Sequence, residues 1–254
     1  MTTDNIYGGG SLGPDRRVAL VTGATRGLGK AMAEELLGSG FAVAFCGRTE
    51  DTVKSLASQL SATGPVMGLA GDLSSEHFAG RLIDAVASRW GRLDILINNA
   101  STLGELPLPS VRNFSRQNFL SVWTLNVLAP LNLVSRALPY LDAVGGMSLA
   151  ISSDAATGGY GGWAAYGGAK AAVDLAYATL ANEEPHLRFY SLDPGDMDTD
   201  MQRQAVLADT SRLRQPQAVA RALAPLFRLE ARYPTGSRLR LADTASGLVM
   251  EVTA

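Results

Sequence analysis

Residues 18–30 read VALVTGATRGLGK and give the strongest indication of the fold. The four leading apolar residues predict a buried strand, and Lys30–Leu37 predicts a helix. Gly23, Gly27 and Gly29 lie between these two elements. Glycine allows positive φ and lets backbone N–H groups approach a phosphate, and a helix N-terminus adds partial positive charge. The stretch is therefore either a pyrophosphate-binding turn or a plain tight turn.

A P-loop, which also binds phosphate at a glycine-rich turn, does not fit these residues. Its pattern is G-x-x-x-x-G-K-[S/T]. Five positions before Gly29 stands Ala24 instead of glycine, and Ala31 follows Lys30 where serine or threonine is needed. This class of triphosphate-binding loop is therefore excluded.

Outward from the turn, short apolar runs alternate with longer amphipathic stretches. Apolar strands separated by helices predict a parallel sheet covered on both faces. Right-handed crossovers then give a doubly wound, Rossmann-type α/β fold of about seven strands. Pro130 is expected to kink or divide the longest helix. The predicted strands are 18–21, 41–46, 66–70, 93–97, 148–151, 188–192 and 238–241, and the predicted helices are 30–37, 51–60, 78–90, 115–141, 164–181 and 217–229.

The composition narrows the class of protein. The chain has 254 residues, 46% of them hydrophobic, which excludes an intrinsically disordered chain. A formal net charge of −2 argues against a nucleic-acid binder, and no apolar run reaches the ~18 residues of a membrane span. The only cysteine, Cys46, cannot form an internal disulfide. We expect a cytoplasmic protein whose partners include neither nucleic acid nor membrane.

Glycine and proline near the start predict a flexible leader. Residues 1–15 include GGGS at 8–11 and GP at 13–14, which favour irregular chain. No other linker, repeat or low-complexity segment follows in the sequence. The predicted organisation is a leader at 1–15 and a single folded domain at 16–254.

Short polar motifs follow the other predicted strands, and each of them alone is common by chance. They are Gly71-Asp72-Leu73 after the third strand, Asn98-Asn99-Ala100 at the end of the fourth, Asn126 in the long helix, Ser152-Ser153 after the fifth, Tyr166 and Lys170 in the next helix, and Pro194-Gly195 with Thr199 after the sixth. Together with the glycine turn, they resemble the classical short-chain dehydrogenase/reductase family in order and spacing, from Arg16 to Ala242. The chain departs from the family pattern at Ser101, where the family has glycine after Asn-Asn-Ala.

Tyr166 and Lys170 lie four residues apart and so share one helix face. Tyrosine has a pKa of ~10 and is a poor acid–base catalyst near neutral pH, but a nearby ammonium group lowers that pKa. The resemblance implies that Tyr166 is the general acid/base, that Lys170 lowers its pKa and binds ribose, and that Ser153 polarises the substrate oxygen. It also implies that Asn126 holds a relay water. Ser152 competes with Ser153, but alternation along a strand turns only one of them toward the site.

The end of the second predicted strand bears on the choice of cofactor. By the resemblance, an enzyme that prefers NAD has an acidic residue at Gly47 for the ribose hydroxyls, and that acid is missing. Arg26 and Arg48 suit a ribose 2′-phosphate instead, although Glu50 and Asp51 lie close by in the sequence. We therefore expect NADP(H) to be preferred, with NAD(H) possible. The cofactor-binding residues that we infer are Gly23, Thr25, Arg26, Gly27, Leu28, Gly29, Arg48, Asp72, Leu73, Asn99, Ala100, Tyr166, Lys170, Pro194, Gly195, Met197 and Thr199.

The candidate substrate-binding residues follow the fourth, fifth and sixth strands. They are Leu103, Asp154, Tyr160, Trp163 and Met201. Apolar and aromatic residues of this kind are more often core packing than recognition. Asp154 directly follows the candidate catalytic serine, where it either attracts a cation or an amine or caps the next turn.

Asp196, Asp198 and Asp200 alternate along the segment after the sixth strand. Three carboxylates invite interpretation as a metal site, but no histidine or cysteine joins them. We interpret them as a solvated loop and predict no metal.

The expected activity is NADP(H)-dependent reduction of a ketone or aldehyde to an alcohol, or the reverse. The alternatives are reduction of an imine or a conjugated double bond, and a non-catalytic NADP(H)-binding regulator. The complete set of four catalytic residues argues against the regulator. The resemblance also implies a homodimer or homotetramer, formed across two helices whose apolar residues are Trp123, Leu125, Leu133, Ala171, Leu175 and Ala178.

Overall fold

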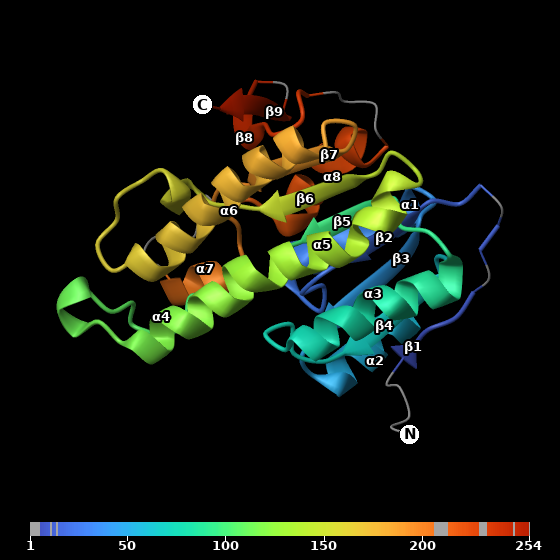
Figure 1. Ribbon diagram of the computed structural model, residues 1–254, viewed down its shortest axis with the longest axis horizontal. Helices are drawn as coiled ribbons and strands as arrows, with labels where there is room; N and C mark the ends of the chain where they lie inside the picture. The colour runs from blue at the N-terminus through green and yellow to red at the C-terminus, as the bar shows by residue number, and fades with distance from the viewer. Residues whose placement is uncertain are drawn as a thin grey trace.

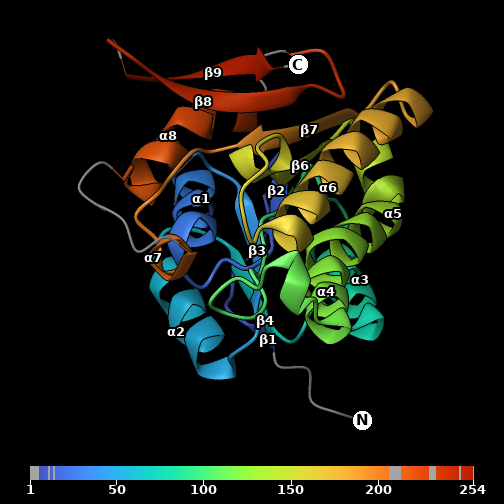
Figure 2. The same ribbon diagram turned by 90° about the vertical axis from the view of Figure 1, so that its left-hand side faces the viewer.

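A continuous β-sheet runs through the centre of the protein, with helices on both of its faces (Figures 1 and 2). The computed structural model describes residues 6–10, 12–13, 15–205, 213–228, 233–245 and 247–253. Within them the sheet has nine strands. Their order is β1 (Ile6–Tyr7), β4 (Val66–Ala70), β3 (Ala42–Gly47), β2 (Val18–Val21), β5 (Ile95–Asn98), β6 (Met147–Ile151), β7 (Arg188–Asp193), β8 (Arg238–Thr244) and β9 (Gly247–Thr253).

Seven neighbouring strands, from β4 to β8 in that order, are parallel. They correspond to the seven predicted strands, and the doubly wound α/β fold is confirmed. All residues of β2 and β3 are buried. Because helices cover both faces of a parallel sheet, the residues of its strands are buried on either side. Such strands appear in the sequence as continuous apolar runs rather than as alternating apolar and polar residues.

The helices form one layer on each face of the sheet (Figure 2). The first layer contains α1 (Gly27–Gly38), α2 (Glu50–Leu60) and α8 (Pro216–Phe227), and the second contains α3 (Glu76–Trp90), α5 (Ala129–Asp142) and α6 (Ala164–Glu183). The helix expected at 217–229 corresponds to α8, and its last residue, 229, lies outside the described residues. In the described part of the chain, no helix is long and apolar enough to cross a membrane.

The first edge of the sheet lies in the segment expected to be a flexible leader. β1 pairs antiparallel with β4, with Ile6 opposite Leu69 and Tyr7 opposite Gly68. The expectation of an irregular leader is therefore wrong at these two residues. An edge strand has unpaired backbone N–H and C=O groups, with which even a two-residue segment can form hydrogen bonds. A segment this short shows no hydrophobic periodicity, so the sequence gives no sign of it. Residues 1–5, 11 and 14 of the predicted leader lie outside the described residues.

The other edge strand, β9, was also not predicted. It folds back antiparallel on β8, from Arg238 opposite Thr253 to Thr244 opposite Gly247. Its residues are exposed or half-buried. A half-exposed edge strand lacks the continuous apolar run by which the central strands are recognised.

The long helix expected at 115–141 is interrupted. α4 (Arg116–Trp123) leads into a π-helical turn at Thr124–Leu128, and α5 then begins with Pro130 in its first turn. Pro130 has no N–H to bond to the carbonyl four residues earlier, which is that of Asn126. The predicted division is present, but it falls on the turn before the proline and includes Asn126.

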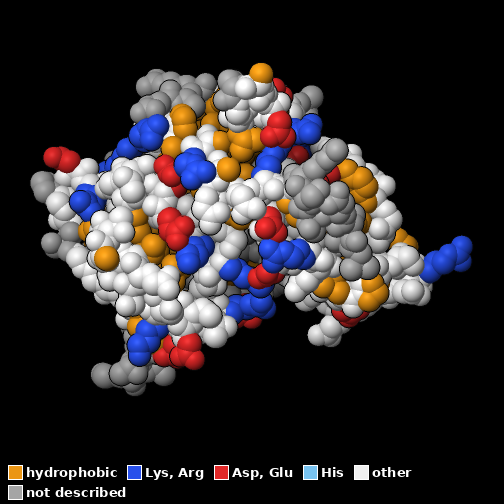
Figure 3. All heavy atoms as spheres, turned by 180° about the vertical axis from the view of Figure 1, so that it is seen from behind, with side chains coloured by type: hydrophobic (Ala, Val, Ile, Leu, Met, Phe, Trp, Pro, Cys, Tyr) orange, Lys and Arg blue, Asp and Glu red, His pale blue; other side chains and the backbone are white. Residues whose placement is uncertain are grey.

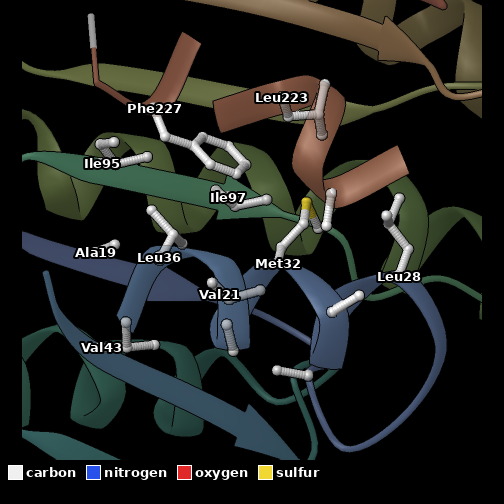
Figure 4. Close-up of a cluster of buried hydrophobic side chains, with 14 of the residues drawn as sticks. Ala19, Val21, Leu28, Met32, Leu36, Val43, Ile95, Ile97, Leu223 and Phe227 are labelled. Carbon is white, nitrogen blue, oxygen red and sulfur yellow. The ribbon is translucent and has the colours of Figure 1, made fainter. Parts of the chain in front are cut away.

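The core consists of two apolar clusters, one on each face of the sheet. Figure 4 shows part of the first cluster, where α1 and α8 pack over β2, β3 and β5. The second lies between the sheet and the layer of α3, α5 and α6. Burial of both sheet faces fixes the carboxyl ends of the strands, where ligands bind in folds of this kind. Labelled in Figure 4 are Ala19, Val21, Leu28, Met32, Leu36, Val43, Ile95, Ile97, Leu223 and Phe227.

Candidate active site

The glycine turn after β2 leaves space that a side chain would fill. Gly23 has φ of +64°, and a Cβ there would lie 2.8 Å from the Cα atom of Ala100. A Cβ on Gly29 would lie 2.5 Å from Nδ2 of Asn99. Such contacts are too short for any side chain, so glycine is required at both positions.

The first turn of α1 presents its backbone N–H groups to the same space. Arg26 is the N-cap residue, and its side chain makes no capping hydrogen bond. The N–H groups at a helix start are then available for an anion, which the helix dipole also attracts. The turn and the helix start therefore fit the pyrophosphate of a dinucleotide.

Thr22 and Asn99 tie this turn to the end of β5. The Oγ1 atom of Thr22 accepts hydrogen bonds from the backbone N–H groups of Asn99 and Ala100, at 2.9 and 3.0 Å. The Nδ2 atom of Asn99 donates to the carbonyl oxygens of Thr22 and Gly23, at 2.9 and 3.2 Å. The carboxyl ends of β2 and β5 are thus fixed relative to each other, at the point where the strand order of the sheet reverses. We did not predict this role of Thr22 from the sequence.

A cavity of about 630 Å³ opens along the carboxyl ends of the strands. All seventeen residues inferred to bind the cofactor line it, and so do Ser153 and all five candidate substrate residues. Asn126, in contrast, is buried behind the wall. The structure therefore brings together in one cavity residues that lie between Gly23 and Ala205 in the sequence.

The two neighbouring serines after β6 have different partners. The Oγ atom of Ser152 is buried and donates to Oδ2 of Asp174 at 2.9 Å. The Oγ atom of Ser153 donates to Oδ1 of Asp154 at 3.0 Å and accepts from the N–H of Ala155. Ser153 is thus the residue that caps the following 3₁₀ turn, and Asp154 is not. Of the two serines, Ser153 has its hydroxyl beside the other candidate catalytic groups.

Tyr166 is buried at the start of α6 in a small apolar cluster with Leu103 and Ala155. Burial raises the pKa of its hydroxyl to about 12, although hydrogen bonds with Ser101 and Ser153 act in the opposite direction. The net shift is therefore opposite to the lowering expected from Lys170, because desolvation of the phenolate is the largest effect. A hydroxyl with this pKa keeps its proton near neutral pH, as a proton donor must.

Lys170 lies one turn further along α6 and is buried. Its Nζ atom donates to the carbonyl oxygen of Ile151 at 2.7 Å and lies 5.5 Å from the centroid of the Tyr166 ring. Burial lowers the pKa of Lys170 to about 8, and the carboxylate of Asp174 acts to raise it. The backbone of β6 thus holds the ammonium group over the face of the Tyr166 ring.

Asn126 is fixed by the loop that follows β5. Its Oδ1 atom accepts hydrogen bonds from the Thr102 N–H, at 2.9 Å, and from the Ser101 hydroxyl, at 3.2 Å. Its Nδ2 atom donates to the carbonyl oxygen of Thr102 at 2.9 Å. Ser101 therefore interacts with both Asn126 and Tyr166. In the sequence, Ser101 stands where the family pattern has glycine, which has no side chain to make either contact.

The part of the cavity beside Gly47 is lined by two arginines, Arg26 and Arg48. Arg26 forms an exposed ion pair with Asp200 at 3.1 Å, whereas Arg48 forms none among the described residues. A Cβ on Gly47 would lie 2.4 Å from Cγ2 of Thr25, so there is no space for an acidic side chain at that position. This end of the cavity therefore fits a ribose 2′-phosphate. Nearby, the hydroxyl of Tyr7 in β1 donates a hydrogen bond to the Glu50 carboxylate.

Arg238, at the start of β8, holds the base of the site together, and no motif in the sequence points to it. Its guanidinium donates to Oδ2 of Asp174 at 2.9 Å and to the carbonyl oxygen of Ser153 at 2.9 Å. It also lies 3.5 Å from Oδ2 of Asp193. All three charged side chains are largely buried. This cluster therefore links the candidate catalytic serine to β7 and α6.

The three aspartates after β7 are bound by neighbouring side chains. Asp196 accepts a hydrogen bond from Gln202, while Asp198 and Asp200 both pair with Arg203. No group of three metal-ligating side chains is found among the described residues. Figure 3, which shows the molecule from behind, likewise has positive and negative side chains next to one another. On this face the charges offset each other locally.

Comparison with known proteins assigns the class. Residues 17–209 match the short chain dehydrogenase family, and the chain belongs to this family, in its classical form. It is thus placed among the short-chain oxidoreductases, which bind nicotinamide cofactors. The match covers the glycine turn and the segment that contains Ser153, Tyr166 and Lys170.

Individual relatives extend this result. Mouse sepiapterin reductase is 37% identical over 204 residues, covering 74% of this chain and 77% of that protein. A 3-oxoacyl-[acyl-carrier-protein] reductase of rhamnolipid biosynthesis from Pseudomonas aeruginosa is 32% identical over 240 residues, covering 87% and 93%. The structure of an alcohol dehydrogenase from Thermococcus sibiricus, complexed with 5-hydroxy-NADP, superposes with a TM-score of 0.81 at 26% identity and covers 89% and 96%.

Proposed function

We propose that this protein is an NADP(H)-dependent carbonyl reductase that converts a ketone or aldehyde to an alcohol, and the reverse. The observation that carries the proposal is the arrangement of Ser153, Tyr166 and Lys170. The hydroxyls of Ser153 and Tyr166 interact, and the ammonium group of Lys170 lies over the tyrosine ring. All three side chains line the cavity that begins at the glycine turn. The names of the relatives, two reductases and an alcohol dehydrogenase, support the same chemistry.

In the proposed reaction the carbonyl oxygen lies against the hydroxyls of Ser153 and Tyr166. Ser153 donates a hydrogen bond to this oxygen and stabilises the negative charge that develops there. The bound dinucleotide supplies the hydride that adds to the carbonyl carbon. Tyr166 donates its proton to the oxygen, which completes the alcohol and leaves a phenolate, and in the reverse direction this phenolate accepts the proton of the alcohol.

Lys170 and Asn126 support this step in the proposal. Lys170 binds the ribose hydroxyls and places its positive charge near the phenolate that forms when Tyr166 loses its proton. Asn126 keeps one Nδ2 hydrogen beyond its bond to Thr102, with which it can hold a water that leads to Lys170. Ser101 lies between Asn126 and Tyr166 and helps to hold the Tyr166 hydroxyl in place.

The test follows NADPH absorbance with the purified protein and a panel of ketones, aldehydes, imines and enones. We expect NADPH oxidation on carbonyl compounds, with an equal amount of alcohol formed. Turnover confined to imines or to carbon–carbon double bonds would replace the proposed reaction with an alternative one. Tight NADPH binding without turnover on any compound would favour a regulator.

Arg48 is expected to decide the preference for NADPH. Replacing Arg48 by alanine removes a cation that can form charge-assisted bonds to the 2′-phosphate, so the KM for NADPH should rise about tenfold. The KM for NADH should stay within about twofold of the wild-type value, since NADH has no such phosphate. Steady-state kinetics with both cofactors measure the two values.

Arg116→Ala is the matched control, because Arg116 is exposed at the start of α4 and does not line the cavity. It should change neither constant. An equal rise in KM for NADPH and NADH in Arg48→Ala would contradict the assigned role.

We further propose that the protein forms a homodimer or homotetramer through the outer faces of α5 and α6. Leu175 is 72% exposed on α6, and Leu128 is 61% exposed just before α5. A shallow, mainly apolar groove continues between the two helices. Leu133, also expected at this interface, is instead part of the core. Large apolar side chains exposed together favour association with another copy.

Leu175→Glu is expected to dissociate the assembly. A carboxylate at the centre of an apolar interface would be buried without a partner, which disfavours association. Sedimentation velocity should show the mass of one chain, while circular dichroism remains that of the wild type. Ser58→Asp, an added charge on an exposed position of α2, is the control and should keep the wild-type mass. An unchanged mass in Leu175→Glu would place the interface elsewhere.

A further inference from the structure

The carboxylate of Asp154 lies directly beside the candidate catalytic serine. Its Oδ1 atom accepts a hydrogen bond from Ser153 Oγ at 3.0 Å, and its Oδ2 atom accepts one from the Tyr160 hydroxyl at 2.8 Å. Asp154 is exposed and lines the cavity. The negative charge therefore stands next to the place where the substrate oxygen is expected.

This carboxylate has no positively charged partner among the described residues. Three other aspartates that line the same cavity do have one: Asp193 lies near Arg238, and Asp198 and Asp200 pair with Arg203. Asp72 and Asp196 also line it, and in the described part of the chain their carboxylates bond only to the Ser74 N–H and to Gln202, but Asp154 is the carboxylate bonded to the candidate catalytic serine. Both partners of Asp154 are neutral hydroxyls. A ligand that carries a positive charge can therefore complete this part of the site.

An aromatic wall adjoins the carboxylate. The rings of Tyr160 and Trp163 meet edge-on with centroids 6.3 Å apart, and those of Trp163 and Tyr166 do so at 5.5 Å. All three residues line the cavity. Aromatic faces attract ammonium groups through their quadrupole, so a carboxylate beside aromatic rings is well suited to bind an amine.

We propose that the site prefers carbonyl substrates with a positively charged amino group, which Asp154 binds while Ser153 and Tyr166 hold the carbonyl oxygen. This inference rests on the proposed carbonyl reductase function and names its substrate class. Three contacts of about 3 Å each, from the amine to Asp154, from Asp154 to Ser153 and from Ser153 to the carbonyl oxygen, separate the amine from that oxygen along a bent path. An amino group two or three carbons from the carbonyl carbon spans that distance.

The hydrogen bond between Ser153 and Asp154 should also weaken the binding of neutral ketones. While Asp154 accepts the Ser153 proton, a neutral ketone must compete with a carboxylate for that donor. Bonds to a charged acceptor are the stronger ones, so the ketone is at a disadvantage. An ammonium group that binds the carboxylate weakens its hold on Ser153 and frees the hydroxyl for the substrate oxygen.

The test compares two ketones of the same shape at pH 7: 4-(dimethylamino)butan-2-one and its neutral isostere 5-methylhexan-2-one. Dissociation constants are measured by calorimetry with the NADP⁺-loaded protein, and kcat/KM is measured with NADPH. The wild type should favour the amino ketone about tenfold in both. In Asp154→Asn this preference should fall to about one.

Asp84→Asn removes the same charge from an exposed position of α3, away from the cavity, and should keep the wild-type preference. Equal binding of the two ketones to the wild type, or an unchanged preference in Asp154→Asn, would overturn the inference while leaving carbonyl reduction intact. Preferential binding of the amino ketone without turnover of either compound would support the inference and count against the proposed function.

Discussion

Tyr166→Phe is expected to lower kcat for ketone reduction by about 10²–10⁴-fold, the usual contribution of a positioned general acid. The variant lacks the one proton that the proposed reaction transfers to the substrate oxygen. The KM for NADPH should stay within a few-fold of the wild-type value, because only one of the seventeen inferred cofactor contacts changes. Steady-state kinetics with NADPH and the best ketone of the panel measure both quantities.

Phenylalanine should fit the space that the tyrosine ring occupies. Leu103 and Ala155 form the apolar cluster around this ring, and they do not depend on the hydroxyl. The hydroxyl interacts with Ser101 and Ser153, which both line the open cavity and can turn to water. The loss of activity should therefore occur in a folded protein.

Tyr177→Phe provides a closely matched control. Tyr177 is also a buried tyrosine on α6, and burial likewise raises its pKa to about 12. Its hydroxyl interacts with Asn98 at 2.8 Å and Ser148 at 3.0 Å, inside the core and away from the cavity. This variant should lose about 1–3 kcal/mol of stability, because two buried polar groups lose a partner, and should keep its kcat. Similar losses of kcat in both variants would remove Tyr166 from the proposed mechanism.

The central strands and the catalytic motifs could be predicted because their signals are local. β2 and β3 are buried along their whole length, and that burial is written as uninterrupted apolar sequence. The motif residues stand at the ends of these strands, so their position follows from the sheet. Once β2, β5 and β6 lie side by side, Gly23, Asn99 and Ser153 must meet at one edge.

Electrostatic properties could not be predicted in the same way. Spacing places Lys170 beside Tyr166, and from this we expected a lowered tyrosine pKa. The sign depends instead on how completely the surrounding chain removes water, and burial raises the pKa of Tyr166. The edge strands β1 and β9 were missed for a related reason, because tertiary pairing rather than hydrophobic pattern stabilises them.

Arg238 is the clearest case of a residue that only the folded structure reveals. In the sequence it is one arginine at the start of a predicted strand. In the structure it contacts groups from α6, β7 and the segment after β6, up to 85 positions away in the chain. Asp174 Oδ1 is buried and has no hydrogen-bond partner among the described residues, so Asp174 depends on its other oxygen for stabilisation.

Arg238→Met is expected to lower the free energy of unfolding by about 3–5 kcal/mol, the usual cost of removing one partner of a buried ion pair. Methionine replaces the apolar part of the side chain but leaves Asp174 and Asp193 largely buried without their cation. Urea denaturation followed by circular dichroism measures the change. Arg240→Met, two residues along β8 at an exposed position, is the control and should change stability by less than about 0.5 kcal/mol.

A second substitution separates the charge effect from lost packing. Arg238→Met combined with Asp174→Leu removes both members of the closest pair, so it should be more stable than the sum of the two single losses predicts. Additive losses would mean that the two side chains act independently. Equal losses in Arg238→Met and Arg240→Met would show that the arginine does not hold the base of the site. If the losses are coupled as expected, Asp174 on α6 and Asp193 on β7 fix the guanidinium of Arg238, and this guanidinium in turn holds the carbonyl oxygen of Ser153.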